Sequence, residues 1–204
     1  MAVPSALASA NEIHAYLVDE MNQALRRPGM YGGEMALGLI LRHLLFAERD
    51  QDDWTAQRQR WERRGLWTST GVKGAFQRLL PQAGDHDTAS AYAEYAHTRD
   101  WLRSERVLSA EEYAPVRAQA RTWAAERDRG WADVTAAFGP PSVHLGGTNP
   151  RYGKVLGYLN GKADEPIVWF HLGDGGVLHA VRFGDGPFAE TFTHTPEGRR
   201  RRRR

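Results

Sequence analysis

Gly139-Pro140-Pro141 divides the sequence into two parts that differ in composition and in hydrophobic pattern. The residues before it are rich in Ala, Arg, Glu and Trp, whereas those after it are rich in Gly, Val, Phe and Thr. A glycine followed by two prolines cannot continue a helix, because proline lacks the backbone N–H and clashes with the preceding turn. The sequence therefore predicts a helical part over residues 11–138 and a β part over residues 139–198.

Capping signals and helical spacing recur through the first part. Ser9 and Glu12 form a capping box, S-x-x-E, ahead of apolar residues spaced by four, and Ser109 begins a second box. The stretch Glu34–Arg49 is apolar on nearly every side, so we expect a buried central helix there. The patterns predict six to seven helices: one before Pro28 and others over about 34–49, 53–64, 72–80, 88–104, 110–129 and 131–138.

The second part consists of short β-rich segments separated by turn sequences such as Asn160-Gly161. The links between them are too short for parallel crossovers. We therefore expect a four- to five-stranded antiparallel meander over residues 143–145, 155–159, 167–172, 177–183 and 188–193. A sheet of this size is marginal alone, so one face is expected to pack on the helices. The predicted fold class is α+β.

The chain ends in six consecutive arginines: Arg199, Arg200, Arg201, Arg202, Arg203 and Arg204. The whole chain has 27 basic and 25 acidic side chains, a net charge of +2, so residues 1–198 carry 21 against 25 and a charge of −4. The basic balance therefore comes from the tail alone. A run of arginines offers nothing to pack into a core, so we expect residues 199–204 to be disordered, as well as residues 1–10.

Composition excludes several kinds of chemistry. Without cysteine, the chain has no disulfide, thiol nucleophile or thiolate metal site. The longest apolar run, Met35–Phe46, is interrupted by Gly38, Arg42 and His43 and is too short for a membrane span. The N-terminus has no basic leader region. The sequence therefore predicts a cytoplasmic protein that does not enter a membrane.

Arg26–Gly33 reads R-R-P-G-M-Y-G-G and resembles the R-P-G-M-Y-I-G segment near the start of the ATPase domain of type II topoisomerases. In that family a helix follows with the stretch H-L-V-Y-E-V-V-D-N, which matches His43–Gln51 here. The family's catalytic glutamate falls on Ala47, its magnesium-binding asparagine falls on Gln51, and no D-x-G-x-G loop follows. The resemblance therefore implies no ATPase.

The same segment also resembles the R-P-G-M-Y-x-G opening of small uncharacterised bacterial proteins, some of which look like immunity proteins that accompany polymorphic toxins. That resemblance implies a protein partner. A simpler interpretation is structural: Pro28 and Gly29 end a helix and form a tight turn against which Tyr31 packs.

Gly146–Lys154 is a glycine-rich run that ends in Gly-Lys. A phosphate-binding loop needs G-x4-G-K-[ST] ahead of a helix. Here five residues separate Gly147 from Gly153, Val155 replaces the hydroxyl residue and a strand follows. We therefore expect an irregular loop and no cofactor. Its polar and aromatic side chains can still contact a partner or an anion: Asn149, Arg151, Tyr152 and Lys154.

Four of the eight histidines lie in the β part: His144, His171, His179 and His194. If residues 173–176 form the turn between them, strand alternation places His171 and His179 on opposite faces. No H-E-x-x-H or H-x-H spacing occurs. His86 lies between two aspartates, in a loop that we expect to be solvated. We therefore predict neither a metal site nor a catalytic group.

Trp54 and Trp61 lie seven residues apart on one predicted helix face, among arginines such as Arg58. Tryptophan beside arginine at a surface is typical of interface hot spots and of platforms for single-stranded nucleic acid. The alternative is that both tryptophans face inward and the arginines form a solvated face.

The sequence leaves three functions open. The first is a non-enzymatic, immunity-like binding protein whose partner is another protein, contacted by Tyr31, Trp54, Arg58, Trp61, Asn149, Arg151, Tyr152 and Lys154. The second is weak, nonspecific nucleic-acid association through the arginine tail. The third is an enzyme with a pocket at the helix–sheet junction, formed by Tyr31, Arg151, Tyr152 and His171.

Overall fold

Seven helices precede the sheet in the part of the chain that the structure describes, residues 9–147, 149 and 151–203 of a computed structural model. They are α1 (Ala10–Arg26), α2 (Gly33–Ala47), α3 (Gln51–Arg64), α4 (Gly71–Leu79), α5 (Asp85–Thr98), α6 (Ala110–Glu126) and α7 (Trp131–Phe138). A short 3-10 turn, η1 (Pro28–Met30), joins α1 to α2. The predicted helical part is confirmed. Ala10, expected to be disordered, begins α1, and residues 1–8 lie outside the described residues.

Local capping explains where the helices begin. In the two predicted capping boxes, the backbone N–H of Ser9 donates to Glu12 at 2.7 Å and that of Ser109 donates to Glu112 at 2.8 Å. α5 begins three residues earlier than predicted, because the Asp87 carboxylate accepts the backbone N–H of Gly84 at 2.8 Å. α5 also ends earlier than predicted, before Asp100, whose left-handed backbone (φ 56°) stops the helix.

The sheet is a five-stranded antiparallel meander in the order β1-β2-β3-β4-β5, as predicted. Its strands are β1 (Val143–Leu145), β2 (Lys154–Tyr158), β3 (Val168–Leu172), β4 (Leu178–Arg182) and β5 (Phe192–His194). Part of the last predicted strand is instead a 3-10 turn, η3 (Phe188–Thr191), in which the Thr191 hydroxyl donates to the Phe188 carbonyl at 2.6 Å.

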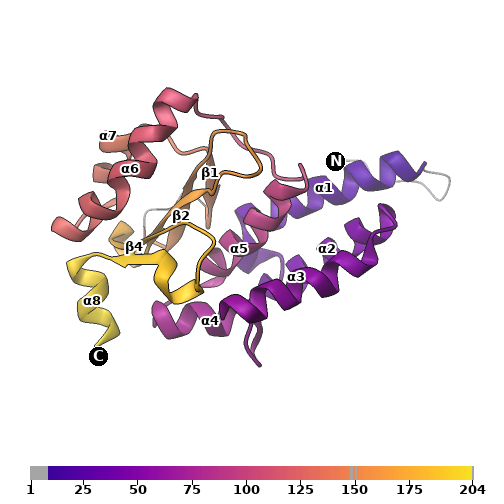
Figure 1. The fold of residues 1–204 in the computed structure, drawn as a ribbon, viewed down its shortest axis with the longest axis horizontal. Coiled ribbons are helices and arrows are strands. Elements are labelled where there is room, and N and C mark those ends of the chain that lie inside the picture. The colour runs from indigo at the N-terminus through magenta and orange to yellow at the C-terminus, as the bar shows by residue number, and fades with distance from the viewer. Residues whose placement is uncertain (1–8, 148, 150, 204) are drawn as a thin grey trace.

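Helices cover both faces of the sheet, rather than the one face that the sequence predicted. On one face Val155, Trp169 and Ala180 join the core formed by α1–α5. On the other face Leu156 and Phe170 join the core formed by α6 and α7. In Figure 1 the strands lie between α6 and α7 on one side and α5 on the other. All residues of β2, β3 and β4 are therefore buried.

The prediction of a disordered arginine tail is wrong for residues 199–203, and Arg204 lies outside the described residues. A last helix, α8 (Pro196–Arg202), begins at Thr195, whose hydroxyl accepts the backbone N–H of Gly198 at 3.1 Å. Arg200 pairs with Asp128 at 2.5 Å, and Arg201 pairs with Glu197 at 2.7 Å. Charge pairing therefore orders a segment that has no apolar side chains to bury. Among the described residues, no helix is long and apolar enough to cross a membrane.

Candidate functional site

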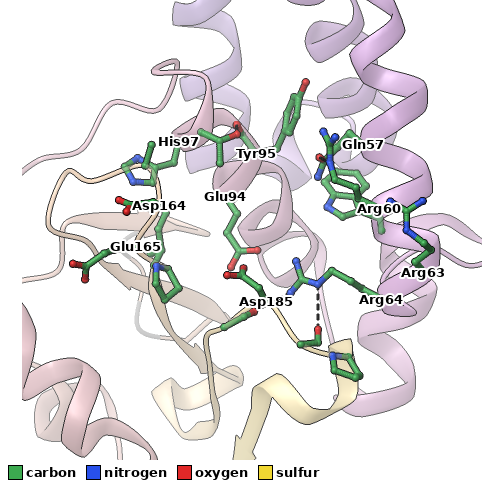
Figure 2. A pocket seen from close by; sticks show the side chains of 18 residues that line it. Gln57, Arg60, Arg63, Arg64, Glu94, Tyr95, His97, Asp164, Glu165 and Asp185 are labelled. Atoms are coloured by element: carbon green, nitrogen blue, oxygen red, sulfur yellow. Dashed lines mark hydrogen bonds between the residues drawn. The ribbon is translucent and has the colours of Figure 1, made fainter.

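A cleft of about 660 Å³ lies at the junction between α3, α5 and two loops of the sheet (Figure 2). α3 contributes arginines to one side, and the loops at residues 163–167 and 184–187 contribute carboxylates to the other. Of the residues that line this cleft, only Trp61 was a predicted site residue, because the lining comes from four segments that are far apart in the sequence.

The two glycine-containing segments singled out in the sequence meet at a second, open groove of about 560 Å³. The backbone N–H of Gly146 donates to the carbonyl of Arg26 at 3.0 Å, which joins the loop before β2 to the end of α1. The groove is lined by polar and apolar side chains from both segments, from the start of α5 and from the turn between β3 and β4, among them Arg27, Met30, Asp85, His86, Asn149, Tyr152 and Asp174. The structure thus brings Asn149 and Tyr152 next to the R-P-G-M-Y segment.

Lys154 does not reach a partner, contrary to the prediction. Its side chain is fully buried, and its Nζ donates to the carbonyls of Asn149 at 2.6 Å and Tyr152 at 2.8 Å. The ammonium also lies 4.7 Å from the ring of Trp131, and burial lowers the pKa of Lys154. Lys154 therefore holds the loop closed, while Asn149, Arg151 and Tyr152 stay exposed.

The four residues predicted to form an enzyme pocket do not converge. Of these, only Tyr152 lines the groove. The Tyr31 hydroxyl donates to Gln23 on α1 at 2.7 Å, and His171 is buried in the sheet with 1 % of its surface exposed.

A β-bulge brings His171 and His179 to the same cavity, so their predicted placement on opposite faces is wrong. His171 pairs with Ala180 across β3 and β4, but the next pair is Leu172 with Leu178. His179 is the extra residue, and alternation fails there. Both imidazoles line a cavity of about 30 Å³, and the Nε2 atom of each is buried without a protein hydrogen-bond partner. A polar cavity of this size can hold a buried water.

Asp87 links two histidines beside that cavity. Its Oδ1 lies 2.7 Å from His171 Nδ1, and its Oδ2 lies 3.1 Å from His86 Nε2. Burial opposes the charge of Asp87, but the two imidazoles hold the pKa of its carboxyl far below the usual value. Burial lowers the pKa of His171. Burial acts in the same way on His86, but nearby carboxylates, Asp87 first, raise its pKa overall. Among the described residues, no group of three or more His, Asp or Glu side chains could hold a metal ion.

The predicted surface platform of Trp54, Arg58 and Trp61 does not form. Trp61 is 3 % exposed, and its ring lies 5.9 Å from that of Trp54 and 6.1 Å from that of Trp67. Trp54 is partly buried against the same core. Arg58 is exposed and pairs with Glu62 one turn along α3. The tryptophans face inward and the arginine faces solvent, as in the alternative interpretation.

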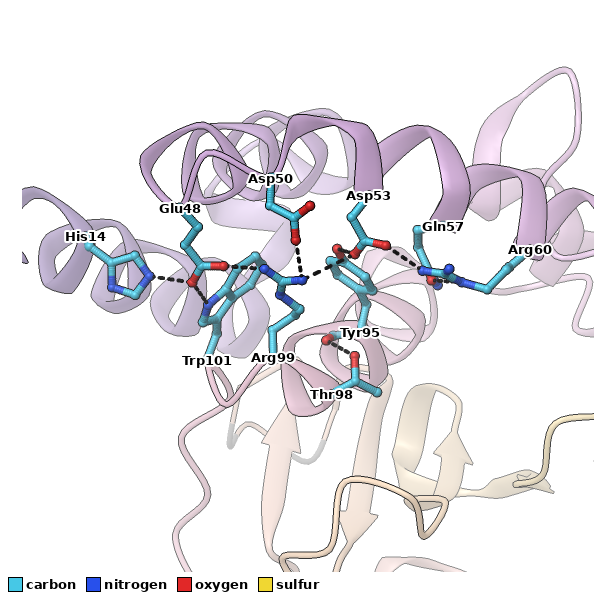
Figure 3. A network of polar contacts seen from close by, with 10 residues as sticks. All are labelled: His14, Glu48, Asp50, Asp53, Gln57, Arg60, Tyr95, Thr98, Arg99 and Trp101. Carbon is cyan, nitrogen blue, oxygen red and sulfur yellow. Dashed lines mark hydrogen bonds and ion pairs between the residues drawn. The ribbon is translucent and has the colours of Figure 1, made fainter.

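The stretch that matches the ATPase helix contributes to an ion-pair network in this chain (Figure 3). Glu48 accepts hydrogen bonds from His14 at 2.8 Å and from the Trp101 indole at 2.7 Å, and it pairs with Arg99. Arg99 also contacts Asp50 at 2.8 Å. Burial opposes ionisation of Glu48, but these donors hold the pKa of its carboxyl below the usual value. Glu48 and Asp50 therefore tie α1, α2 and α5 together.

α2 presents an apolar stripe to solvent, so the helix that was predicted to be central and buried is buried on one side only. Met35 is 84 % exposed, Leu39 is 46 % exposed and Phe46 is 68 % exposed, whereas Leu37 and Leu41 are fully buried. α1 and α5 pack on the buried side. The one sequence signal for the open side was the pair of polar residues, Arg42 and His43, within the apolar run.

The docked position of α8 changes what the tail can offer to nucleic acid. Because Arg200 and Arg201 are already ion-paired, fewer than six arginines are free to contact phosphates. We expect a single-stranded oligonucleotide to bind weakly. With six phosphate contacts, the logarithm of the binding constant would fall by about 4 for each tenfold rise in salt concentration, and we expect a smaller fall here. Fluorescence anisotropy at two salt concentrations measures this slope. Deleting residues 199–204 should abolish binding, and tight binding by residues 1–198 would contradict the prediction.

No protein-family model matches this sequence, and neither the curated proteins nor the solved structures include a significant match.

Proposed function

We propose that this chain is a protein-binding module that docks an amphipathic helix of another protein on the exposed face of α2. The exposure of Met35, Leu39 and Phe46 on one side of that helix carries the proposal. Large apolar side chains grouped at a surface are typical of protein interfaces. Met30, in the turn before α2, is 78 % exposed and adds a second flexible apolar side chain to this region.

The spacing of the stripe supports a helical partner. Met35, Leu39, Arg42 and Phe46 follow one another at intervals of four, three and four residues. This is the a/d spacing of a two-stranded coiled coil, in which each side chain packs between side chains of the facing helix. At a rise of about 1.5 Å per residue the stripe is roughly 16 Å long, so about three turns of a partner helix would cover it.

The position of Arg42 indicates that the partner helix has an acidic residue facing it. Its Nε donates to the carbonyl of Gly38 on the same helix at 3.2 Å, and within the described residues it makes no ion pair. A helix laid over α2 would take this guanidinium out of water, which is costly unless a carboxylate faces it. Two copies of this chain in a symmetric antiparallel pair would bring like charges together. The partner is therefore a different protein.

The test uses the purified full-length chain and the purified products of adjacent genes, because the resemblance to immunity-like proteins makes those products the first candidates. We expect one of them to bind with a dissociation constant of about 1 µM or lower in isothermal titration calorimetry. Met35→Glu and Phe46→Glu should each weaken binding by roughly thirtyfold or more, because they place a charge in a desolvated apolar contact.

Val107→Glu is the matched control, since Val107 is also apolar and 55 % exposed but lies outside α2. It should leave binding unchanged. Arg42→Glu should weaken binding, and a partner variant with its facing carboxylate changed to arginine should restore it. The proposal fails if no adjacent gene product binds at micromolar concentration, or if Val107→Glu weakens binding as much as Phe46→Glu does.

A further inference from the structure

The cleft between α3, α5 and the loops of the sheet has opposite charges on its two sides (Figure 2). Its basic side consists of Arg60, Arg63 and Arg64, and its acidic side consists of Glu94, Asp164, Glu165 and Asp185. Buried Trp61 and Ile167 line the inner wall. A volume of about 660 Å³ is within the range of small-molecule sites.

Contacts within the protein hold Glu94 in position at the cleft. Its Oε1 accepts the indole N–H of Trp169 at 2.9 Å and lies 2.9 Å from Nη1 of the fully buried Arg182. The carboxylate is 24 % exposed, so it remains open to the cleft. Glu94 therefore needs no reordering to meet a ligand.

Asp185 is positioned by the backbone on either side of it. Arg64 donates from Nη2 to the carbonyl of Gly184 at 2.9 Å and from Nε to that of Gly186 at 3.2 Å. These bonds join the loop to α3, and Asp185 and Glu94 both line the cleft (Figure 2). Within the described residues Asp185 makes no ion pair, so it is a negative charge without a partner.

The basic side is also arranged before any ligand binds. Arg60 and Arg63 are three residues apart on α3 and share one face of the helix. Arg60 is held by Gln57 at 2.7 Å and by Asp53 at 3.0 Å. Arg63 makes no ion pair in the part of the chain that the structure describes. The cleft thus has an unpaired guanidinium on one side and an unpaired carboxylate on the other.

We propose that this cleft binds a zwitterion of amino-acid chemistry, with its cationic group beside Asp185 and Glu94 and its carboxylate beside Arg63. A phosphate or nucleic acid would meet the carboxylates of the opposite side, and an apolar ligand would leave charges on both sides without partners. A ligand with both charges satisfies both sides, and its methylene groups can pack on Trp61 and Ile167. Free amino acids and peptide segments share this chemistry.

Isothermal titration calorimetry with defined probes distinguishes a free amino acid from a peptide segment as the ligand. The probes are L-arginine, a capped Arg-Gly-Gly-Asp tetrapeptide, agmatine, which lacks the carboxylate, and N-acetylcitrulline, which lacks the cation. We expect L-arginine or the tetrapeptide to bind with a dissociation constant of about 1 mM or lower. Agmatine and N-acetylcitrulline should bind at least about tenfold more weakly, because each loses a charge-assisted contact. Tighter binding of the tetrapeptide identifies a peptide segment as the ligand, and tighter binding of L-arginine identifies a free amino acid.

Two exposed residues supply the variants, and two others supply the controls. Arg63→Ala and Asp185→Asn should each weaken binding of the zwitterion about tenfold. Arg78→Ala and Asp52→Asn change exposed side chains outside the cleft and should leave binding unchanged. The proposal is overturned if neither zwitterion binds, if agmatine binds as tightly as L-arginine, or if the control variants weaken binding as much as the cleft variants. Because α2 contributes no residue to the cleft, these results are independent of the α2 variants.

Discussion

Replacing Asp87 with alanine is expected to lower the free energy of unfolding by about 3–5 kcal/mol, the usual cost of removing one member of a buried charged pair. Asp87 is 4 % exposed. Its carboxylate accepts from His171 at 2.7 Å, contacts His86 at 3.1 Å and accepts the backbone N–H of Gly84 at 2.8 Å. Without it, two imidazoles and the first turn of α5 lose their acceptor. The loss is a large share of the roughly 5–15 kcal/mol that stabilises a typical domain.

Asp87→Asn removes the negative charge but keeps nearly the same side-chain shape, so it shows how much of the loss comes from the charge. The amide oxygen can still accept the Gly84 N–H, but the negative charge between the two imidazoles is lost. We therefore expect a smaller loss, of about 1–3 kcal/mol. Urea denaturation at neutral pH measures both variants. Asp52→Ala, an exposed aspartate in the first turn of α3, is the control and should change stability by less than about 1 kcal/mol.

The same carboxylate predicts a loss of stability in acid. The folded-state pKa of Asp87 lies below its unfolded value of about 4, so its contribution is fully present above that pH and is lost as the pH falls through the folded-state value. His171 acts in the same direction, because its lowered pKa keeps it neutral in the folded state while the unfolded chain takes up a proton below about pH 6.5. His86 acts in the opposite direction, because Asp87 raises its pKa, and its contribution is complete below about pH 6.5. Urea denaturation of the unmodified protein should therefore show stability falling below about pH 4, where Asp87 begins to take up its proton. A loss below about 1 kcal/mol in Asp87→Ala would contradict this account.

The features that could be predicted from the sequence depend on neighbouring residues. Gly139-Pro140-Pro141 stops α7 and precedes β1, because proline acts on the turn that contains it. The capping boxes at Ser9 and Ser109 likewise need only residues within one turn. Short turn sequences exclude parallel strands, so the meander also followed from local signals.

The features that could not be predicted depend on tertiary pairing. The bulge at His179 arises from the register between β3 and β4, and strand alternation alone gives no sign of it. A helix that is apolar all round, such as α2, has no preferred buried side until α1 and α5 pack on it. α8 is ordered through contacts such as Arg200 with Asp128, which are 72 residues apart. The cleft between α3, α5 and the loops of the sheet is formed by four segments, and none of them contains a recognisable motif.

Arg182 is the second position at which we expect a large effect. Its side chain is fully buried, with Nη1 2.9 Å from Glu94 and Nη2 donating to the Ser90 hydroxyl at 3.0 Å. The guanidinium also lies 5.5 Å from the ring of Phe76. Arg182→Ala should lower the free energy of unfolding by about 3–5 kcal/mol, because it leaves a cavity and removes the counter-charge of Glu94.

Arg182→Met shows how much of that loss comes from volume rather than charge. Methionine fills most of the space against Phe76 and Phe188, and Glu94 is exposed enough for water to solvate it once the guanidinium is gone. The substitution also removes the Arg182 Nε, a buried donor that has no hydrogen-bond partner. We therefore expect Arg182→Met to cost at most about 1–2 kcal/mol in urea denaturation, with an unchanged dependence on denaturant. If Arg182→Ala and Arg182→Met lowered the free energy of unfolding equally, the ion pair, and not the packing of the long side chain, would stabilise β4 against α5.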